Sequence, residues 1–177
     1  MALEIYIGPM FAGKTTKLFE MFRYDSVKNK LVIDYKNEET EEIVIEYLHN
    51  HTEDVLDNVY KTNRLKKISD SIEIRDRSNI YINECQFFPD LKEFVLDQLT
   101  KLNNVYLYGL DGDFKQELFG QTMELIPYCK YIEKITGKCE CCNNPSLVSY
   151  RTSIQKELYL PDSSCYIPLC LACMDSM

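Results

Sequence analysis

Gly8-Pro9-Met10-Phe11-Ala12-Gly13-Lys14-Thr15-Thr16 follows directly on the apolar run Leu3-Glu4-Ile5-Tyr6-Ile7. The first stretch matches G-x4-G-K-[ST], the glycine-rich loop that connects a strand to a helix and holds phosphate groups. Its glycines let successive backbone N–H groups approach a phosphate, and the helix N-terminus behind them favours negative charge. Residues 3–7 therefore predict a strand, and residues 8–16 predict a phosphate-binding loop.

The loop also predicts which nucleotide groups it meets. Lys14 is expected to contact the β and γ phosphates, and the hydroxyl of Thr15 is expected to bind Mg²⁺ between them. The pattern thus indicates an ATP or GTP site with Mg²⁺; the alternative is a glycine-rich turn that merely precedes a helix. Residues 17–27 favour that helix, with no proline and with one apolar stripe that includes Leu18, Phe19, Met21, Phe22 and Val27.

Three more strands alternate with helices along the chain. Residues 30–35, 79–82 and 104–109 are apolar runs, and Pro89-Asp90 opens a helix with apolar positions at Leu91, Phe94, Val95 and Leu99. Such alternation predicts an α/β fold, a mostly parallel sheet of the P-loop NTPase type with helices on both faces. Ligands bind beyond the carboxyl ends of such strands, so the loops that start at Gly8, Asn83 and Leu110 are expected to converge.

Residues 36–77 are polar and only weakly periodic, and they predict little. His49 and His51 lie there and are interpreted as solvated surface rather than as catalytic residues. The run Arg64-Leu65-Lys66-Lys67 is open to two interpretations, a phosphate contact or a solvated helix face.

The chain of 177 residues is 45% hydrophobic and carries a formal net charge of −8. The acidic balance argues against a broad nucleic-acid surface, because proteins that follow a phosphate backbone concentrate Lys and Arg. No apolar stretch approaches the length of a membrane span, and the start of the sequence does not resemble a secretory signal. We therefore expect no membrane or nucleic-acid polymer among the partners and a cytoplasmic location.

Eight cysteines in such a protein favour metal ligands over disulfides. Two C-x2-C pairs, Cys139 with Cys142 and Cys170 with Cys173, have the spacing of a structural Zn²⁺ site of ribbon type. Cys141 is interpreted as a bystander, and Cys85, Cys129 and Cys165 as small buried hydrophobic residues. The sequence thus predicts residues 1–135 as a nucleotide-binding domain and residues 136–177 as a small zinc-binding lobe, with a β-rich stretch at 157–160.

Asn83-Glu84 ends the strand at 79–82, where P-loop enzymes keep an acidic pair. One carboxylate of such a pair serves the Mg²⁺ site and the other accepts a proton from the attacking hydroxyl. Only the second is present here, which makes Glu84 the candidate general base; the alternative is an ordinary solvated carboxylate.

Four segments in order resemble the type II, zinc-containing thymidine kinases of cells and poxviruses. They are residues 8–16, Glu84-Cys85-Gln86-Phe87-Phe88-Pro89-Asp90, Leu110-Asp111-Gly112-Asp113-Phe114 with Phe119-Gly120, and the two C-x2-C pairs. Gly-Pro-Met-Phe-Ala-Gly-Lys and Gln-Phe-Phe-Pro-Asp are specific to that family rather than to P-loop proteins in general. The resemblance covers nearly the whole chain.

The resemblance implies transfer of the γ-phosphoryl group of ATP to the 5′-hydroxyl of thymidine, with Glu84 as general base. It also implies a nucleoside pocket and a lid loop over it, carried by the zinc lobe. The pocket walls correspond to Met10, Phe87, Leu110, Phe114 and Phe119; without the resemblance, these five are equally well explained as core. The lid corresponds to Tyr166 and to the backbone of Glu157, Leu158, Tyr159, Leu160 and Pro161.

The residues that match the family's ATP-phosphate and Mg²⁺ site are Gly8, Pro9, Met10, Phe11, Ala12, Gly13, Lys14, Thr15, Thr16 and Asn83. A homotetramer and feedback inhibition by thymidine triphosphate are further properties that the resemblance implies.

Three departures from the family pattern matter. Asn83 replaces an aspartate, so the strand end brings no negative charge to Mg²⁺. Glu38-Glu39-Thr40 stands where the family has Asp-Thr-Arg, and the missing arginine leaves Lys36 and Arg64 as candidate substitutes. Pro161-Asp162 replaces the Gly-Gly turn of the lid. The favoured hypothesis is a working thymidine kinase; a nucleotide-binding pseudoenzyme is the alternative, and a generic P-loop ATPase is a distant third.

Overall fold

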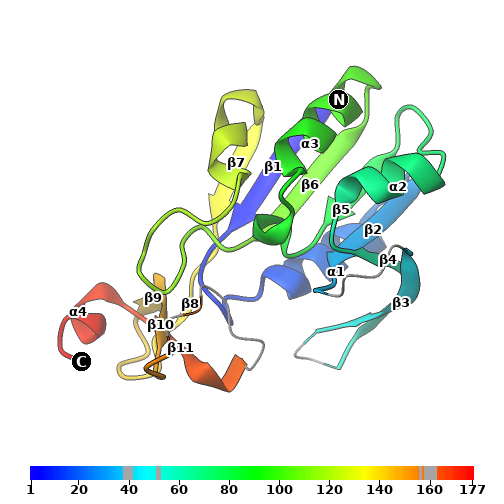
Figure 1. The fold of residues 1–177 in the computed structure, drawn as a ribbon. Helices are drawn as coiled ribbons and strands as arrows, with labels where there is room; N and C mark the ends of the chain where they lie inside the picture. The colour runs from blue at the N-terminus through cyan, green and yellow to red at the C-terminus, as the bar shows by residue number, and fades with distance from the viewer. Residues whose placement is uncertain (38–41, 51–52, 156, 158–162) are drawn as a thin grey trace.

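The computed structural model describes residues 1–37, 42–50, 53–155, 157 and 163–177 (Figure 1). Its central sheet has the strand order β3-β4-β2-β5-β6-β1-β7. The bounds are β1 Ala2–Ile7, β2 Lys30–Tyr35, β3 Val44–His49, β4 Val55–Thr62, β5 Asn79–Ile82, β6 Asn104–Gly109 and β7 Tyr131–Lys134. Every neighbouring pair is parallel except β3 with β4. The expected mostly parallel sheet is confirmed.

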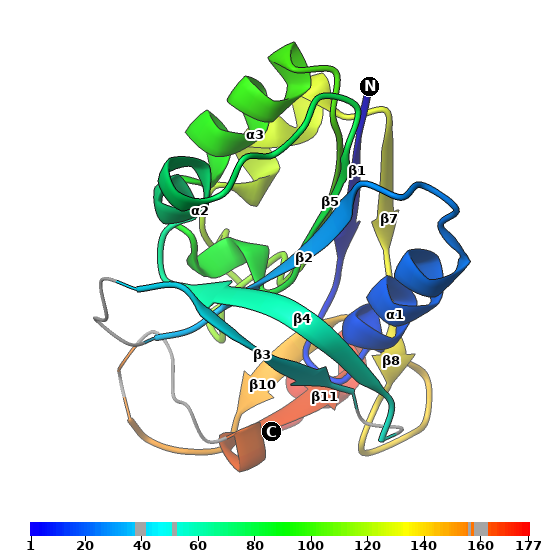
Figure 2. The same cartoon turned by 90° about the vertical axis from the view of Figure 1, so that its right-hand side faces the viewer.

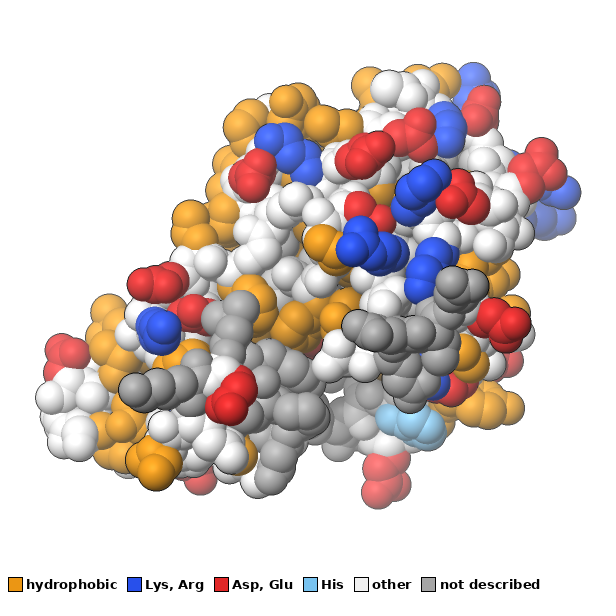
Figure 3. Space-filling model, viewed as in Figure 1, with side chains coloured by type: hydrophobic (Ala, Val, Ile, Leu, Met, Phe, Trp, Pro, Cys, Tyr) orange, Lys and Arg blue, Asp and Glu red, His pale blue; other side chains and the backbone are white. Residues whose placement is uncertain are grey.

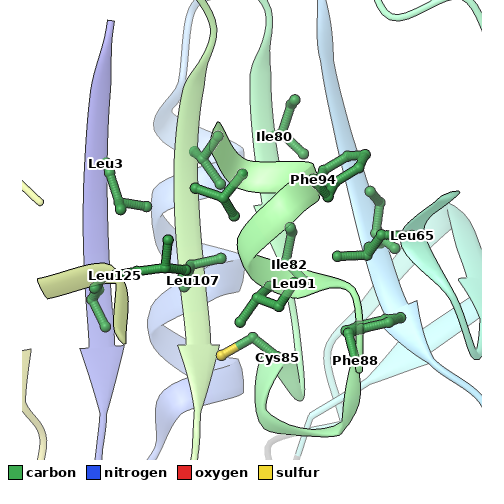
Figure 4. Close-up of a cluster of buried hydrophobic side chains, with 14 of the residues drawn as sticks. Leu3, Leu65, Ile80, Ile82, Cys85, Phe88, Leu91, Phe94, Leu107 and Leu125 are labelled. Atoms are coloured by element: carbon green, nitrogen blue, oxygen red, sulfur yellow. The ribbon is translucent and has the colours of Figure 1, made fainter. Parts of the chain in front are cut away.

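Helices cover both faces of the sheet, as predicted. Figure 2 shows α1 (Lys14–Tyr24) on one face and α2 (Leu65–Ser71) with α3 (Leu91–Thr100) on the other. Strand side chains alternate between the two layers: Ile80 and Ile82 pack beneath α3, where Leu91 and Phe94 also point (Figure 4). Tyr81, between those two isoleucines, packs beneath α1. The strands are thus buried on both faces, as parallel strands generally are.

Helix α1 ends earlier than the apolar stripe suggested. Its last residue is Tyr24, so Val27 lies beyond the helix. The carboxylate of Asp25 accepts a hydrogen bond from the backbone N–H of Val27 at 2.9 Å, and Lys30 Nζ donates to the carbonyl oxygen of Asp25 at 2.6 Å. These bonds turn the chain toward β2.

Residues 36–77, from which the sequence predicted little, contain β3, β4 and α2. The carboxylate of Asp90, next to α3, accepts hydrogen bonds from the backbone N–H groups of Leu65 (3.1 Å) and Lys66 (2.8 Å), and so caps α2. The run 64–67 therefore starts a helix on the α3 face, which favours the solvated interpretation. His49 is exposed at the end of β3, as expected, and His51 lies outside the described residues.

The chain after β7 forms a small lobe beyond the carboxyl ends of the strands (Figure 1). It holds β8 (Gly137–Lys138), β9 (Pro145–Ser146), β10 (Val148–Arg151), β11 (Tyr166–Leu169) and α4 (Leu171–Met174). Of the expected β-rich stretch, Glu157 belongs to no strand, and 158–160 lie outside the described residues. The hydroxyl of Ser149 on β10 accepts a hydrogen bond from the backbone N–H of Met10 at 2.8 Å, which joins the lobe to the phosphate loop.

On the face drawn in Figure 3, Lys and Arg side chains lie among Asp and Glu side chains. Within the described ranges, none of the helices has the length and apolar character needed to cross a membrane.

Gly8 provides a test of how tightly the phosphate loop is packed. A Cβ atom there would lie 2.0 Å from the carbonyl oxygen of Ile135, whereas a Cβ on Gly112 would meet its nearest atom at 3.4 Å. We expect Gly8→Ala to lower the free energy of unfolding by about 2 kcal/mol, which is a Tm drop of roughly 4–8 °C. Thermal unfolding checks this, with Gly112→Ala as the matched control. Equal Tm values for the two variants would contradict the packing argument.

Candidate active site

The phosphate loop has the backbone that its sequence predicts. Gly13 has a positive φ of 87°, which glycine adopts without strain, and α1 begins at the next residue. Lys14 is buried, and its Nζ donates a hydrogen bond to the carbonyl oxygen of Pro9 at 2.6 Å. Burial lowers the pKa of this ammonium group, and the carboxylates of Glu84 and Asp111 act in the opposite direction. The loop thus holds one buried cation at the start of a helix.

Glu84 follows β5 in the left-handed region, with φ 49° and ψ 40°, which is uncommon for a residue other than glycine. Its carboxylate accepts a hydrogen bond of 2.6 Å from Nε2 of Gln86, in the short 3₁₀ helix η1 (Cys85–Phe87). The other end of that amide, Oε1, accepts from the backbone N–H of Leu110 at 3.0 Å. Gln86 therefore fixes the candidate base against the end of β6.

Two glycines make room for Gln86. A Cβ on Gly109 would lie 2.4 Å from Oε1 of Gln86, and a Cβ on Gly120 would lie 2.2 Å from the carbonyl oxygen of Gln86. Sequence reasoning gave Gln86 no role of its own; the signal was its place two residues after the candidate base.

The predicted convergence of three loops is seen as one cavity of about 290 Å³. The phosphate loop contributes Met10, Phe11, Gly13, Lys14, Thr15 and Thr16 to its lining, and Glu84, Phe87 and Leu110 come from the other two loops. Tyr35 and Ser163 complete the lining, and neither was singled out from the sequence. The candidate base and the phosphate loop therefore face the same space.

A second, nearly filled pocket adjoins the first. Its walls include four of the five predicted nucleoside-pocket residues and the lid aromatic: Met10, Leu110, Phe114, Phe119 and Tyr166. Met10 and Leu110 line both spaces. The fifth residue, Phe87, packs edge-on against Phe119 at 5.2 Å and stacks on Tyr35 at 4.9 Å. Of the predicted lid backbone, Glu157 is exposed, and 158–161 lie outside the described residues.

Arg151, at the end of β10, is a buried cation that sequence reasoning missed. Its guanidinium lies 3.7 Å from the ring centroid of Phe114 and 5.0 Å from that of Tyr166. It also donates hydrogen bonds to the hydroxyl of Tyr166 and to the carbonyl oxygens of Gln155 and Glu157. Arg151 thus connects the aromatic pocket to the chain that enters the predicted lid.

Asn83 is buried, and its Nδ2 donates a hydrogen bond of 2.8 Å to Oδ1 of Asp34, at the end of β2. Burial raises the pKa of the Asp34 carboxyl to about 6. Nζ of Lys61 on β4 lies 3.8 Å from Oδ2 of the same carboxylate. Sequence reasoning missed this partner of Asn83, although an acidic residue within a buried apolar strand was a visible signal.

The candidate substitutes for the missing arginine lie elsewhere. Among the described residues that line the cavity, neither Lys36 nor Arg64 is present. Lys36 Nζ pairs with Glu46 at 3.0 Å, and Arg64 is exposed before α2. Residues 38–40, the site of the departure itself, lie outside the described residues.

The four predicted metal ligands come together. The Sγ atoms of Cys139, Cys142, Cys170 and Cys173 all lie within 4.8 Å of one another, with Cys142 and Cys170 at 3.6 Å. Four thiolates about 2.3 Å from a central zinc would be about 3.8 Å apart, so the cluster fits that ion. Backbone N–H groups, that of Cys170 foremost, lower the pKa of the Cys139 thiol, whereas the neighbouring sulfurs of Cys142 and Cys170 raise that of Cys173.

The remaining cysteines behave as expected in part. Cys141 is exposed and is not in the cluster. Cys85 is fully buried in the α3-side core, and burial raises the pKa of its thiol to about 12, which makes it unreactive. Cys129 and Cys165 are only half-buried.

The neighbouring cysteines allow a matched test of the metal site. We expect Cys170→Ser to lose the bound zinc, about one equivalent per chain, and to lower Tm, because structural zinc sites supply folding free energy. Cys141→Ser is expected to keep both. Metal content by atomic absorption together with thermal unfolding checks this; full zinc occupancy in Cys170→Ser would contradict the assignment.

Comparisons with known proteins agree with this arrangement. A family model described as thymidine kinase matches residues 1–174. The chain is 34% identical over 187 residues to the thymidine kinase of Choristoneura biennis entomopoxvirus, covering 98% of this chain and 96% of that protein. It is 29% identical over 181 residues to the thymidine kinase of Amsacta moorei entomopoxvirus, covering 99% of each.

The likeness extends to a cellular protein. Thymidine kinase 1 of Dictyostelium discoideum is 28% identical over 179 residues, covering 98% of this chain and 78% of that protein. With the family model matched over nearly every residue, and with the phosphate loop, the strand-end carboxylate and the cysteine cluster in place, the chain belongs to the thymidine kinase family.

Proposed function

We propose that this chain transfers the γ-phosphoryl group of ATP to the 5′-hydroxyl of thymidine. The observation that carries the proposal is the shared cavity: Lys14 and Thr15 of the phosphate loop line the same space as Glu84. The aromatic pocket adjoins that space through Met10 and Leu110. A nucleoside base in the pocket would leave its sugar facing the cavity, which is the relation that phosphoryl transfer needs.

In this reaction the 5′-oxygen bonds to the γ-phosphorus, the bond from that phosphorus to the β–γ bridging oxygen breaks, and ADP leaves. Glu84 accepts the proton of the attacking hydroxyl. Lys14 and the backbone N–H groups of the loop stabilise the charge on the phosphate oxygens. When bound with the nucleotide, Mg²⁺ would neutralise the same oxygens, and the oxygen donors that fit it are Thr15 and Asn83. Gln86 holds the Glu84 carboxylate in place.

The pocket chemistry supports a small, flat base. Phe114, Phe119 and Phe87 offer aromatic surface, and Met10 offers an adaptable thioether. Because the pocket is nearly filled by its own side chains, a pyrimidine requires less displacement of its walls than a purine does. Feedback by thymidine triphosphate, a homotetramer and a cytoplasmic location stay predictions from the sequence.

One observation favours a second candidate. Asn83 carries no charge and its Nδ2 is engaged by Asp34, which is compatible with a nucleotide-binding pseudoenzyme. The experiment that separates the two is transfer of labelled γ-phosphate from ATP to thymidine over a range of Mg²⁺ concentrations, with deoxycytidine as control. Thymidine-dependent product supports the kinase. No product from a folded, zinc-loaded protein that still binds thymidine supports the pseudoenzyme.

Replacing the candidate base tests the mechanism. We expect Glu84→Gln to lower kcat by about 100- to 10,000-fold, the usual contribution of general base catalysis, while the affinity for ATP changes little. Glu20→Gln, an exposed carboxylate on α1, is the control and should leave kcat unchanged. Steady-state kinetics and ATP titration check this; lost ATP affinity in Glu84→Gln would show that Glu84 has a structural role instead.

Arg151 connects the aromatic pocket to the predicted lid, and this role can be tested against Lys115, a second cation over the ring of Phe114. Arg151→Lys keeps the charge but loses the planar guanidinium, so we expect KM for thymidine to rise about 10-fold, with KM for ATP nearly unchanged. Lys115 also lies over Phe114, at 5.5 Å, but it is exposed. Lys115→Ala should leave both constants near those of the parent. A comparable rise in KM for thymidine in Lys115→Ala would contradict the assignment of this role to Arg151.

A further inference from the structure

Asp34, near the end of β2, and Asn83, directly after β5, lie on the same face of the sheet. Val32 and Tyr81, two residues earlier on β2 and β5, both pack beneath α1. Because side chains on a strand alternate between faces, Asp34 and Asn83 lie on that face too. Helix α1 begins there with Lys14 and Thr15 of the phosphate loop.

Asp34 and Asn83 lie beside the cavity, because the residue that follows each of them in the sequence lines it. Tyr35, after Asp34, and Glu84, after Asn83, both line it together with the phosphate loop. The negative charge of Glu84 is close enough to contribute to the raised pKa of the Asp34 carboxyl. Asp34 is thus a buried carboxylate at the border of the proposed nucleotide site, with no role in the mechanism so far.

The hydrogen bond between the two side chains decides which way the amide faces. Asn83 offers one acceptor, Oδ1, and one donor group, Nδ2. A carboxylate only accepts, so Asp34 can bind Nδ2 alone, and the bond of 2.8 Å uses it. The amide oxygen, the only side-chain atom of Asn83 that can ligate a hard cation, is therefore turned away from Asp34.

One neighbouring cation partly offsets the cost of burying a carboxylate at this position. Oδ2 of Asp34 lies 3.8 Å from Nζ of Lys61, which also lies 3.5 Å from Oε2 of Glu46 on β3. Lys61 thus provides the cation that a buried carboxylate requires. An asparagine at position 34 could hydrogen-bond to either Nδ2 or Oδ1 of Asn83, so it would not fix the orientation of that amide. It would also carry no charge.

We propose that Asp34 is a positioning residue for the nucleotide-bound Mg²⁺: it fixes the Asn83 amide with Oδ1 toward the phosphate loop and supplies from β2 the negative charge that Asn83 does not bring. The inference rests on the proposed function, since it assigns a part of the same site. Asn83 stands where the family has an aspartate, and on this proposal Asp34 on the neighbouring strand supplies the negative charge that is missing there.

The test exchanges the two groups. Asp34→Asn removes the charge and the orienting acceptor; the double variant Asp34→Asn, Asn83→Asp returns one carboxylate to the pair on the other strand. Glu46→Gln is the matched control, because it removes a carboxylate beside Lys61 that does not contact Asn83. Binding of a non-hydrolysable ATP analogue is titrated with and without Mg²⁺, and thermal unfolding is recorded for each protein.

We expect Asp34→Asn to weaken Mg²⁺-dependent binding of the analogue about 10-fold, which corresponds to about 1.4 kcal/mol, and to leave metal-free binding unchanged. The double variant should recover to within about 3-fold of the parent, and Glu46→Gln should match the parent.

An unchanged Mg²⁺ dependence in Asp34→Asn would overturn the proposal. So would a double variant that regains the parent's Tm without regaining Mg²⁺-dependent binding, since the role would then be structural; this comparison also decides the matter if Asp34→Asn alone fails to fold. A parent protein that binds the analogue with no response to Mg²⁺ would overturn the inference, whereas a parent that shows the response but transfers no phosphate to thymidine would overturn only the proposed function.

Discussion

Parallel pairing of β1 between β6 and β7 is the constraint on which the site depends. Ile7 is level with Gly109 on one side and with Lys134 on the other. The phosphate loop, the segment from Leu110 and the approach to the C-terminal lobe therefore all leave the sheet at one height. Gly8 leaves the strand so close to Ile135 that no side chain fits between them. A shift of β1 by one residue would exchange its two buried faces and separate the phosphate loop from Glu84.

The C-terminal lobe contributes contacts to the site itself, in addition to the predicted lid. Ser149 binds the backbone of Met10, and Arg151 joins Phe114 and Tyr166 to the chain beyond β10. The cysteine cluster holds the two ends of this arrangement, since Cys139 and Cys142 precede β10 and Cys170 and Cys173 follow β11. Loss of a metal from the cluster would therefore disturb the position of Met10, which lines both the cavity and the aromatic pocket.

Much of this could be predicted from the sequence, because the signals were local. The strands β2, β5 and β6 start and end where their apolar runs do, and the C-x2-C pairs identified the cysteine cluster. What could not be predicted depends on contacts across the fold: Gln86 reaching Leu110, Arg151 stacking on Phe114, and Asp34 binding Asn83 over 49 positions of sequence. The β3–β4 pair was missed because charged residues interrupt its apolar positions, Glu46 in β3 and Asp57 and Lys61 in β4.

Lys14 is held in place by the fold itself. Its side chain is buried and tied to the carbonyl oxygen of Pro9. A lysine free in solvent has about 2 kcal/mol of rotamer entropy to lose when it is fixed. Here most of that entropy is lost during folding, so it lowers the stability of the protein rather than the affinity for any anion that the loop would bind. The loop is therefore preorganised, and the cost of that order is part of the free energy of folding.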